Sequence, residues 1–327
     1  MLKRVGVLGV GSYAPERILS NEDLERLVDT SDEWIQTRTG MRERRIVAKD
    51  QATSDLCYAA SKVALERAGL AAEEIGVIIV ATVTPDHVCP ATACHLQRLL
   101  GAKQAAGFDL SVACTGFVNA LMTGHSLVAS GAFPNALVLG ADSLSTITNY
   151  EDRESCVLFG DGAGAVVLAP TNEGSQIIDH IVGIDGEGAD MIIVPAGGSR
   201  RPASHETVDN REHALQLQGR KVFRFAVTKF AEVVPAIVAR NGFEIDDLDL
   251  IIPHQANLRI IEAGADKLGV SMDKVLVNVD RFGNTSSASI PLAIDEACRT
   301  GRLQRGNLVC LVGFGGGLSW GASLLRW

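Results

Sequence analysis

The hydrophobic pattern of the chain alternates between short apolar runs and longer amphipathic segments. The short runs predict strands at residues 3–10, 77–82, 108–112, 135–140, 248–252, 274–279 and 308–312. Between them, apolar residues recur three and four positions apart, which predicts helices at residues 21–28, 54–68, 91–100, 220–240 and 289–298. A glycine-rich turn at residues 159–168 leads into one more strand. Pro235 lies late in the helix at 220–240 and is expected to bend or interrupt it.

Strands and helices follow one another in the same order in both halves of the chain. Strands that alternate with helices imply βαβ units, and nearly continuous apolar strands imply sheets covered on both faces. We therefore expect a duplicated α/β fold with five layers (helices, sheet, shared central helices, sheet, helices) and two mixed, mainly parallel sheets. The polar, irregular stretch at residues 171–218 is the predicted link between an N-terminal half, residues 1–172, and a C-terminal half, residues 173–327.

The periodicity changes at a cysteine inside residues 108–131. A strand at 108–112 is followed by Ala113-Cys114-Thr115-Gly116 and then by a helical pattern of apolar residues. The first turn of a helix has unpaired N–H groups and a partial positive charge, which favours a thiolate and lowers the pKa of the thiol. Cys114 is therefore a candidate nucleophile. The alternative is a buried cysteine that acts as a small hydrophobic residue.

Composition narrows the class of protein. Of 327 residues, 46% are hydrophobic and 21% are charged, as in globular proteins with a large core. A net charge of -9 makes nucleic acid an improbable partner, and no apolar run reaches the roughly 18 residues of a membrane span. The apolar run after Lys3-Arg4 is short for a signal peptide and is better explained as a first strand. Seven scattered cysteines suit reduced thiols in the cytoplasm.

Three polar or glycine-rich loops in the second half follow predicted strands. They are PHQAN at residues 253–257, RFGNTSSAS at 281–289 and GFGGGLSWG at 313–321. The carboxyl ends of strands carry the sites of α/β proteins. Each loop alone would be an ordinary turn. Together with Cys114 they supply a nucleophile, two hydrogen-bond donors and a loop of backbone N–H groups, which are the requirements for acyl transfer through a thioester.

These motifs resemble β-ketoacyl-[acyl carrier protein] synthase III, the initiating condensing enzyme of type II fatty acid synthesis in the thiolase superfamily. The resemblance extends over essentially the whole chain, through TSDEWIQTRTGMRERR, the Cys114 turn, FGDGAGAVVL, PHQANLR, FGNTSSASIPLA and GFGGGLSWGASL. The PHQAN and GNTSSAS loops are specific for this branch, because elongating synthases have a second histidine where this chain has Asn284. The resemblance implies a thiolase-like fold and a decarboxylative condensation of an acyl-CoA primer with malonyl-[acyl carrier protein] to give 3-oxoacyl-[acyl carrier protein]. It implies no metal or other cofactor.

By resemblance, the catalytic residues are Cys114, His254 and Asn284. Cys114 accepts the acyl group, and His254 and Asn284 donate hydrogen bonds to the enolate formed when carbon dioxide leaves. The backbone N–H groups of Cys114 and Gly316 match the oxyanion hole of the family.

The resemblance also assigns the substrate-binding residues. Trp34 and Arg153 match the pair that holds the CoA adenine. The other matching positions contact the nucleotide and its phosphates, the pantetheine arm or the acyl group, and they are Thr30, Arg38, Asn257, Phe159 and Cys89. Cys89 matches the residue that closes the acyl pocket of the partner in a homodimer. Because acetyl-preferring relatives have a bulky aromatic there, the small Cys89 predicts longer or branched primers.

An acidic carrier protein needs a local basic patch on this net acidic chain. Arg259 matches the carrier contact of the family, Arg224 with Arg220 extends it, and Gln255 and Ala256 are assigned to the same contact. Asp266, beside Lys267, stands where relatives often carry a second basic residue.

Other functions remain possible from the residues. A related synthase III-like acyltransferase of secondary metabolism fits the same motifs, and a non-catalytic acyl-binding protein would not need the three catalytic side chains. A degradative thiolase needs a second active-site cysteine, but Cys310 precedes the glycine-rich loop. The dinucleotide-like pattern at residues 9–14 is followed by Pro15 rather than a helix. Four side chains of types that can bind zinc lie close together in the sequence, but their spacing is not that of a standard zinc site. They are His87, Cys89, Cys94 and His95.

Overall fold

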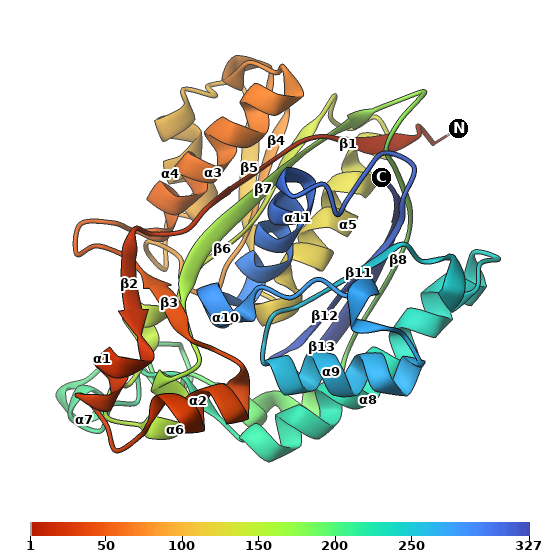
Figure 1. The fold of residues 1–327 in the computed structure, drawn as a ribbon. Coiled ribbons are helices and arrows are strands. Elements are labelled where there is room, and N and C mark those ends of the chain that lie inside the picture. Colours follow the sequence, from red (N-terminus) through yellow and green to blue (C-terminus); the bar gives the residue numbers. More distant parts are fainter. Residues whose placement is uncertain (1) are drawn as a thin grey trace.

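The structure is a computed structural model that describes residues 2–327. Figure 1 shows five stacked layers, with two sheets separated and covered by helices. One outer layer is α3 (Thr53–Ala68) and α4 (Thr92–Leu100), the central layer is α5 (Gly116–Ala129) and α11 (Ser289–Arg299), and the other outer layer is α8 (Gly219–Arg240) and α9 (Leu258–Leu268). The predicted five-layer α/β architecture is confirmed.

The two sheets contain nine strands. The first has the order β1 (Val5–Tyr13), β7 (Asp161–Pro170), β6 (Ala136–Ser143), β4 (Val77–Ala81), β5 (Ala106–Leu110), and the second the order β11 (Leu250–Pro253), β12 (Leu308–Gly315), β13 (Ser319–Arg326), β8 (Gln176–Ile184). Only the pairs β4–β6, β4–β5 and β11–β12 are parallel. The sheets are therefore mixed, as expected, but the expectation that they are mainly parallel is wrong. The connection from β12 to β13 is too short for a crossover helix, so these strands must pair antiparallel.

The core lies on both faces of each sheet. All five residues of β4 are buried, as continuous apolar strands require. Helix α5 contacts β6 and β4 on one side and β13 and β8 on the other, so the helix that follows Cys114 occupies the central layer as predicted. At Gly124 a Cβ would lie only 2.6 Å from Val138 Cγ2, so this close approach of α5 to β6 requires glycine.

Two segments differ from the expected elements. The predicted strand at 274–279 is reduced to one isolated bridge between Val275 and Ile251, and α10 (Val279–Phe282) follows it. The stretch at 171–218, expected to be irregular, contains β8, α7 (His205–Asp209) and the pair β9 (Ile192–Ile193) and β10 (Gln216–Leu217). Strand β8 is only partly buried, and the polar pair Asp179 and His180 interrupts its apolar sequence, which hid the strand pattern.

Helix α8 continues through Pro235 to Arg240, so of the two predicted effects the interruption is wrong, and the bend stays a prediction. Proline removes one backbone hydrogen bond, but Phe230, Val234 and Ile237 are fully buried on the helix face that packs against the second sheet. Tertiary packing of this face stabilises the helix more than one missing bond destabilises it.

Smaller elements gather at one end of the layers, at the lower left of Figure 1. They are β2 (Arg17–Ser20), β3 (Glu43–Ile46), α1 (Asn21–Glu25), α2 (Asp32–Thr39) and α6 (Arg153–Cys156). Helix α1 starts behind the N-cap Ser20 as predicted and is shorter than expected.

Among residues 2–327, no helix combines the length and the apolar character needed to cross a membrane. The division of the chain at residues 172 and 173 stays a prediction.

Candidate active site

Cys114 lies between strand β5 and helix α5, as the change of period predicts. Residues Ala113–Thr115 form a single 3₁₀ turn, and α5 begins at Gly116. Ala113 has a φ of 45°, a left-handed conformation that is unusual for a residue with a side chain. The cysteine is thus presented on a tight turn between the edge strand β5 and the central helix α5.

The electrostatics of Cys114 differ from the expectation. Burial, and with a smaller effect the Asp142 carboxylate, raises the pKa of the Cys114 thiol to about 12 against the opposing effects of the Ser286 hydroxyl and of the backbone. The predicted lowering of this pKa is therefore wrong, because desolvation outweighs the N-terminal position. The thiol is protonated at neutral pH, so a thiolate needs hydrogen-bond donors close to the sulfur.

An apolar cavity of about 160 Å³ brings several predicted residues together. Cys114, Phe159, Ala256, Asn257 and Asn284 all line it. The remaining lining was not predicted from the sequence, and it consists of Val83, Ala113, Leu144, Leu158, Ile192, Leu215, Leu217, Gly219, Val222, Phe223, Ile260 and Ser286. A mainly apolar wall with a few polar groups suits a small acyl group. The alternating pattern of the sequence ALQLQ at residues 214–218 was the available signal for Leu215 and Leu217.

His254 follows β11 and is 1% exposed. Its backbone N–H donates to Val312 O at 2.7 Å, and its Nδ1 lies 2.7 Å from Ser289 Oγ at the start of α11. Burial lowers the pKa of His254 to about 3, so the imidazole is neutral near pH 7. If Ser289 donates to Nδ1, the proton of the ring is on Nε2. Sequence reasoning did not identify Ser289.

Asn284 is held by a strand-like bridge to Phe159. Its backbone N–H donates to Leu158 O at 2.8 Å, and its Oδ1 accepts from Ser286 N at 2.9 Å. Because Oδ1 is occupied by a donor, the amide orientation is defined and Nδ2 is the group left to donate to a ligand.

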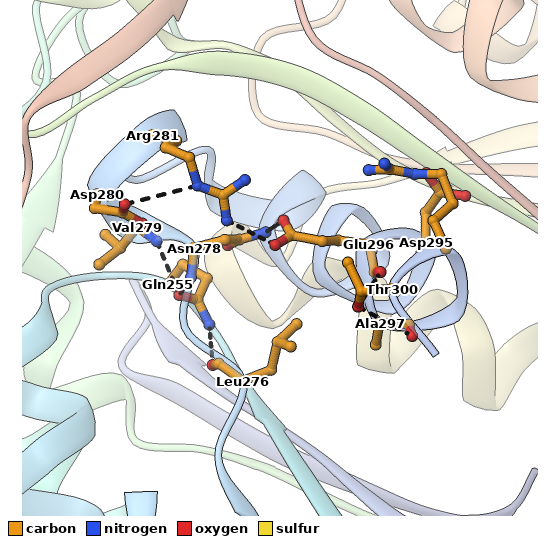
Figure 2. A network of polar contacts seen from close by, with 11 residues as sticks. Gln255, Leu276, Asn278, Val279, Asp280, Arg281, Asp295, Glu296, Ala297 and Thr300 are labelled. Atoms are coloured by element: carbon orange, nitrogen blue, oxygen red, sulfur yellow. Dashed lines mark hydrogen bonds and ion pairs between the residues drawn. The ribbon is translucent and has the colours of Figure 1, made fainter. Parts of the chain in front are cut away.

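Gln255 was assigned to carrier-protein contact, and its position contradicts this. The side chain is 1% exposed. Its Nε2 donates to Pro253 O and Leu276 O, and its Oε1 accepts from the backbone N–H groups of Asn278 and Val279, as Figure 2 shows in part. All its polar atoms are used internally, so no side-chain contact with a partner is left.

These bonds give Gln255 a positioning role instead. It follows His254 in the chain, and it holds the first residues of α10, which ends at Phe282, two residues before Asn284. On the other side of this network, Glu296 of α11 accepts hydrogen bonds from Asn278 and Arg281 (Figure 2). The Gln255 amide therefore ties the loop of His254 to the loop of Asn284.

The glycine-rich segment lies directly against the cysteine. A Cβ on Gly315 would be 2.8 Å from Cys114 Cβ and 2.9 Å from Cys114 N, and one on Gly316 would be 3.4 Å from Ala113 Cβ. The segment predicted as a loop at 313–321 is mostly strand, since β12 extends to Gly315 and β13 begins at Ser319. Its backbone thus reaches Cys114 as part of a rigid hairpin.

The residues predicted to bind CoA lie on α2, α6 and the neighbouring loops. Arg153 Cζ is 5.2 Å from the centre of the Trp34 ring, so the predicted pair is in contact. Asn257 Nδ2 donates to Arg38 O at 3.1 Å. Thr30 Oγ1 is buried without a hydrogen-bond partner in the described part of the chain, residues 2–327. Cys89 is exposed and does not line the cavity of its own chain.

A basic groove of about 580 Å³ adjoins the acyl cavity. Arg220, Arg224, Arg259 and Lys267 line it together with Phe223, which also lines the acyl cavity. Three of these cations belong to the predicted patch, and Lys267 extends it. A positive groove beside the cavity suits an anionic partner.

Three alternatives find no support in the geometry. Within residues 2–327, no three histidine, cysteine or acidic side chains are grouped so that they could hold a metal ion. Strand β1 extends through residues 9–13, and no helix follows the dinucleotide-like pattern. Cys310 is completely buried in β12 and does not line the cavity, so it does not supply the second active-site cysteine of a degradative thiolase.

Comparison with known proteins identifies the family. Residues 108–186 match the family described as 3-oxoacyl-[acyl-carrier-protein (ACP)] synthase III, and residues 238–327 match its C-terminal domain. The chain is 51% identical over 323 residues to a β-ketoacyl-[acyl-carrier-protein] synthase III of Desulfitobacterium hafniense, and the match covers 99% of this chain and 98% of that protein. It is 49% identical to the protein of the same name from Clostridioides difficile, and this match covers 100% of this chain and 99% of that protein. The crystal structure of 3-oxoacyl-[acyl-carrier-protein] synthase III from Aquifex aeolicus superposes with a TM-score of 0.91 at 43% identity, covering 99% of this chain and 100% of that one.

The fold is therefore that of the thiolase-type condensing acyltransferases. The chain belongs to the β-ketoacyl-[acyl carrier protein] synthase III family, the enzymes that initiate type II fatty acid biosynthesis by condensation. Its substrates are accordingly acyl-CoA and an acyl carrier protein thioester.

Proposed function

We propose that this chain condenses an acyl-CoA primer, acetyl-CoA or a longer or branched one, with malonyl-[acyl carrier protein] through a thioester on Cys114. The product is 3-oxoacyl-[acyl carrier protein]. The observation that carries the proposal is that one apolar cavity is lined by both Cys114 and Asn284, with the glycine backbone of β12 against the cysteine and a basic groove beside the cavity.

In the first half-reaction the sulfur of Cys114 attacks the carbonyl carbon of the acyl-CoA. The tetrahedral oxyanion accepts hydrogen bonds from the backbone N–H groups of Cys114 and Gly316. The C–S bond to CoA then breaks, and the proton of the Cys114 thiol ends on the CoA thiolate. Loss of one oxyanion donor typically lowers the rate about 10²–10³-fold.

In the second half-reaction malonyl-[acyl carrier protein] loses carbon dioxide, and the electron pair of the broken bond forms an enolate. Its oxygen accepts hydrogen bonds from His254 Nε2–H and Asn284 Nδ2–H. This role requires a neutral His254 with its proton on Nε2, which agrees with its lowered pKa and assigns Ser289 Oγ as the donor in its contact with Nδ1. The enolate carbon attacks the thioester and releases Cys114. Loss of carbon dioxide makes the condensation effectively irreversible.

CoA binding is proposed along α2 and α6. The adenine inserts between Trp34 and Arg153, which requires these two side chains to separate because they now contact each other. Thr30 and Arg38 contact the nucleotide and its phosphates, and Asn257 contacts the pantetheine arm that leads to Cys114.

Carrier-protein docking is proposed on the basic groove through Arg224 and Arg259, with Ala256 beside it. Both arginines are exposed, and the groove opens next to the acyl cavity. Replacing either with glutamate should raise the KM for malonyl-[acyl carrier protein] with little effect on acylation by acyl-CoA. Lys49→Glu, at an exposed position outside the groove, is the matched control. An unchanged KM in both groove variants would refute this docking surface.

A homodimer is proposed with Cys89 lining the acyl pocket of the partner. Strand β5 has only one neighbour in its sheet and is partly exposed, and Val88 beside Cys89 is 97% exposed. Unpaired strand edges and exposed apolar residues favour association with a second copy. Sedimentation equilibrium should give twice the mass of the chain.

We also place the protein in the cytoplasm, because all seven cysteines are free thiols.

Mass spectrometry after incubation with acetyl-CoA tests the central proposal. The wild type should carry one acetyl group on Cys114. Cys114→Ala should lose the adduct and the condensation, and Cys114→Ser should fail as well because an alcohol does not ionise near neutral pH. Wild-type turnover by Cys114→Ala would refute the assignment of the nucleophile.

A priming role in secondary metabolism is the second candidate. The priming β-ketosynthase from the R1128 polyketide biosynthetic pathway superposes with a TM-score of 0.90 at 38% identity, covering 99% of this chain and 96% of that one. A primer-specificity assay with malonyl-[acyl carrier protein] as the extender separates the two roles. A protein that binds acyl-CoA without forming the Cys114 adduct would instead be a non-catalytic acyl-binding protein.

A further inference from the structure

Ser286 lies next to the catalytic residues and has no role in the two half-reactions. Ser286 is 2% exposed and lines the same cavity as Cys114 and Asn284. Its Oγ is buried and has no hydrogen-bond partner among residues 2–327. A buried hydroxyl without a partner loses its hydration without compensation, so it usually has a functional reason.

The backbone of Ser286 adds a second, independent observation. Its φ is 49°, in the left-handed region that glycine adopts freely and other residues rarely do. Strained residues of this kind gather at functional sites, held by the structure around them. Here Ser286 N donates to Asn284 Oδ1 at 2.9 Å, while the next residue, Ser287, donates to Asp142 through both its N and its Oγ. The turn is therefore fixed on both sides of Ser286.

The charge around Cys114 explains what such a hydroxyl does. Asp142 is completely buried close to Cys114 and accepts hydrogen bonds from Ser287 and from Val83 N. This carboxylate and the burial of the sulfur both disfavour a thiolate, and the Ser286 hydroxyl is the side chain that opposes them. The same hydroxyl also counteracts the effect of burial on the pKa of Asp142, so the Cys114 sulfur and the Asp142 carboxylate compete for its proton.

We propose that the Ser286 hydroxyl donates a hydrogen bond to the Cys114 sulfur as the thiol loses its proton, and is thus a further catalytic residue of this enzyme. The inference rests on the proposed role of Cys114 as nucleophile. Ser286 keeps its own proton throughout, and the proton of Cys114 leaves with CoA as described above. When the sulfur becomes part of a neutral thioester, the hydrogen bond from Ser286 weakens. This hydrogen bond therefore stabilises the reactive thiolate more than the acylated enzyme.

Thr285 provides a matched control in the adjacent position. Its Oγ1 is also buried without a hydrogen-bond partner within the described residues, and it is 1% exposed, but Thr285 does not line the cavity. Thr285→Val removes a hydroxyl of the same kind from the same turn without touching the sulfur.

The test is the rate of Cys114 alkylation by iodoacetamide at several pH values between about 7 and 9, followed at that residue by mass spectrometry of the full-length protein. This range lies below the pKa of Cys114, so the rate follows the thiolate fraction. Ser286→Ala should lower the alkylation rate about 10–100-fold at every pH, which corresponds to an upward shift of the Cys114 pKa by about one to two units, and slow acylation by acetyl-CoA at neutral pH by a similar factor. Ser286→Gly should show the same shift although glycine relieves the backbone strain, and its melting temperature should not fall. Thr285→Val should match the wild type.

The outcomes separate this inference from the proposed function. If the Cys114 profiles of Ser286→Ala and Ser286→Gly superpose on that of the wild type, the hydrogen bond does not exist. An equal shift in Thr285→Val would show an effect of the turn rather than of the Ser286 hydroxyl, and it would overturn the inference as well. Failure of wild-type Cys114 to become acylated refutes the proposed function, while the alkylation profiles still decide whether Ser286 stabilises the thiolate.

Discussion

Replacement of Gly315 by alanine should disable acylation while preserving the fold. The new Cβ would lie 2.8 Å from Cys114 Cβ, about 0.6 Å inside the 3.4 Å at which ordinary van der Waals contact begins. Its other close neighbours are the backbone nitrogen of Cys114 at 2.9 Å and its Cα at 3.2 Å, so no flexible side chain can move aside. Either strand β12 or the Cys114 turn must shift.

The size of the effect follows from the tolerance of the site. Catalytic groups must be held to within about 0.5 Å of their productive positions, so a shift of this size displaces the sulfur relative to the oxyanion donors. We expect kcat/KM for acylation to fall about 10²–10³-fold, the loss typical of one oxyanion donor. Overpacking should also destabilise the fold by about 1–3 kcal/mol.

The assay is acylation of Cys114 by acetyl-CoA, measured by rapid quench and mass spectrometry, with thermal unfolding in parallel. Gly313→Ala is the matched control on the same strand, because its Cβ would be 3.4 Å from Cys114 O and 3.5 Å from Thr115 Cα, which are ordinary contacts. It should remain close to wild type. A Gly315→Ala enzyme with wild-type kcat/KM and an unchanged melting temperature would show that the close approach of β12 is not needed.

Three further predictions concern the catalytic pair, the primer and the pH dependence of stability. His254→Ala or Asn284→Ala should cripple decarboxylation of malonyl-[acyl carrier protein] yet leave some acyl transfer to Cys114; normal condensation by either variant would remove that residue from its role. Wild type should accept butyryl- and isobutyryl-CoA as well as acetyl-CoA, since each buried methylene contributes about 0.8 kcal/mol, and Cys89→Phe should shift kcat/KM toward acetyl-CoA; a wild type that strongly prefers acetyl-CoA, with no change in Cys89→Phe, contradicts the pocket argument. Burial lowers the pKa of His180 from its ordinary value of 6.5 to about 3, so below pH 6.5 this residue binds more protons in the unfolded state than in the folded state. The free energy of unfolding should therefore fall as the pH drops from about 6.5 toward 3. Chemical denaturation of His180→Gln should give a shallower slope between about pH 5 and 6.5, and an identical slope would exclude His180 as a contributor.

Local patterns in the chain were sufficient for most of the fold. The strands β4, β6 and β12 lie at continuous apolar runs, because strands covered on both faces are apolar throughout. The amphipathic helices α3 and α11 lie where the period of 3.6 places them, because a helix buried on one face needs apolar residues at that spacing. The turn at Cys114 was equally visible, since a change of period marks the junction between strand and helix.

Strand direction and helix continuity depended on the tertiary structure. Which strands pair antiparallel is decided by connection length and by neighbours distant in sequence, as the hairpin of β12 and β13 shows. Helix α8 likewise tolerates Pro235 because its apolar face is buried against the second sheet, a contact that no local pattern contains.

The chemistry of the site divides in the same way. Residue types and spacing pointed to Cys114 and to the three loops, because acyl transfer requires a nucleophile, hydrogen-bond donors and backbone N–H groups. The resemblance to the synthase III family assigned Cys114, His254 and Asn284 as the catalytic residues, and their roles stay a prediction. Their environments follow from packing. The pKa of Cys114 is raised rather than lowered because other segments bury the sulfur beside Asp142, and Gln255 is an internal clamp because residues 276–279 close over it. Burial and hydrogen-bond partners are properties of contacts between segments far apart in the chain, so only the folded structure could decide them.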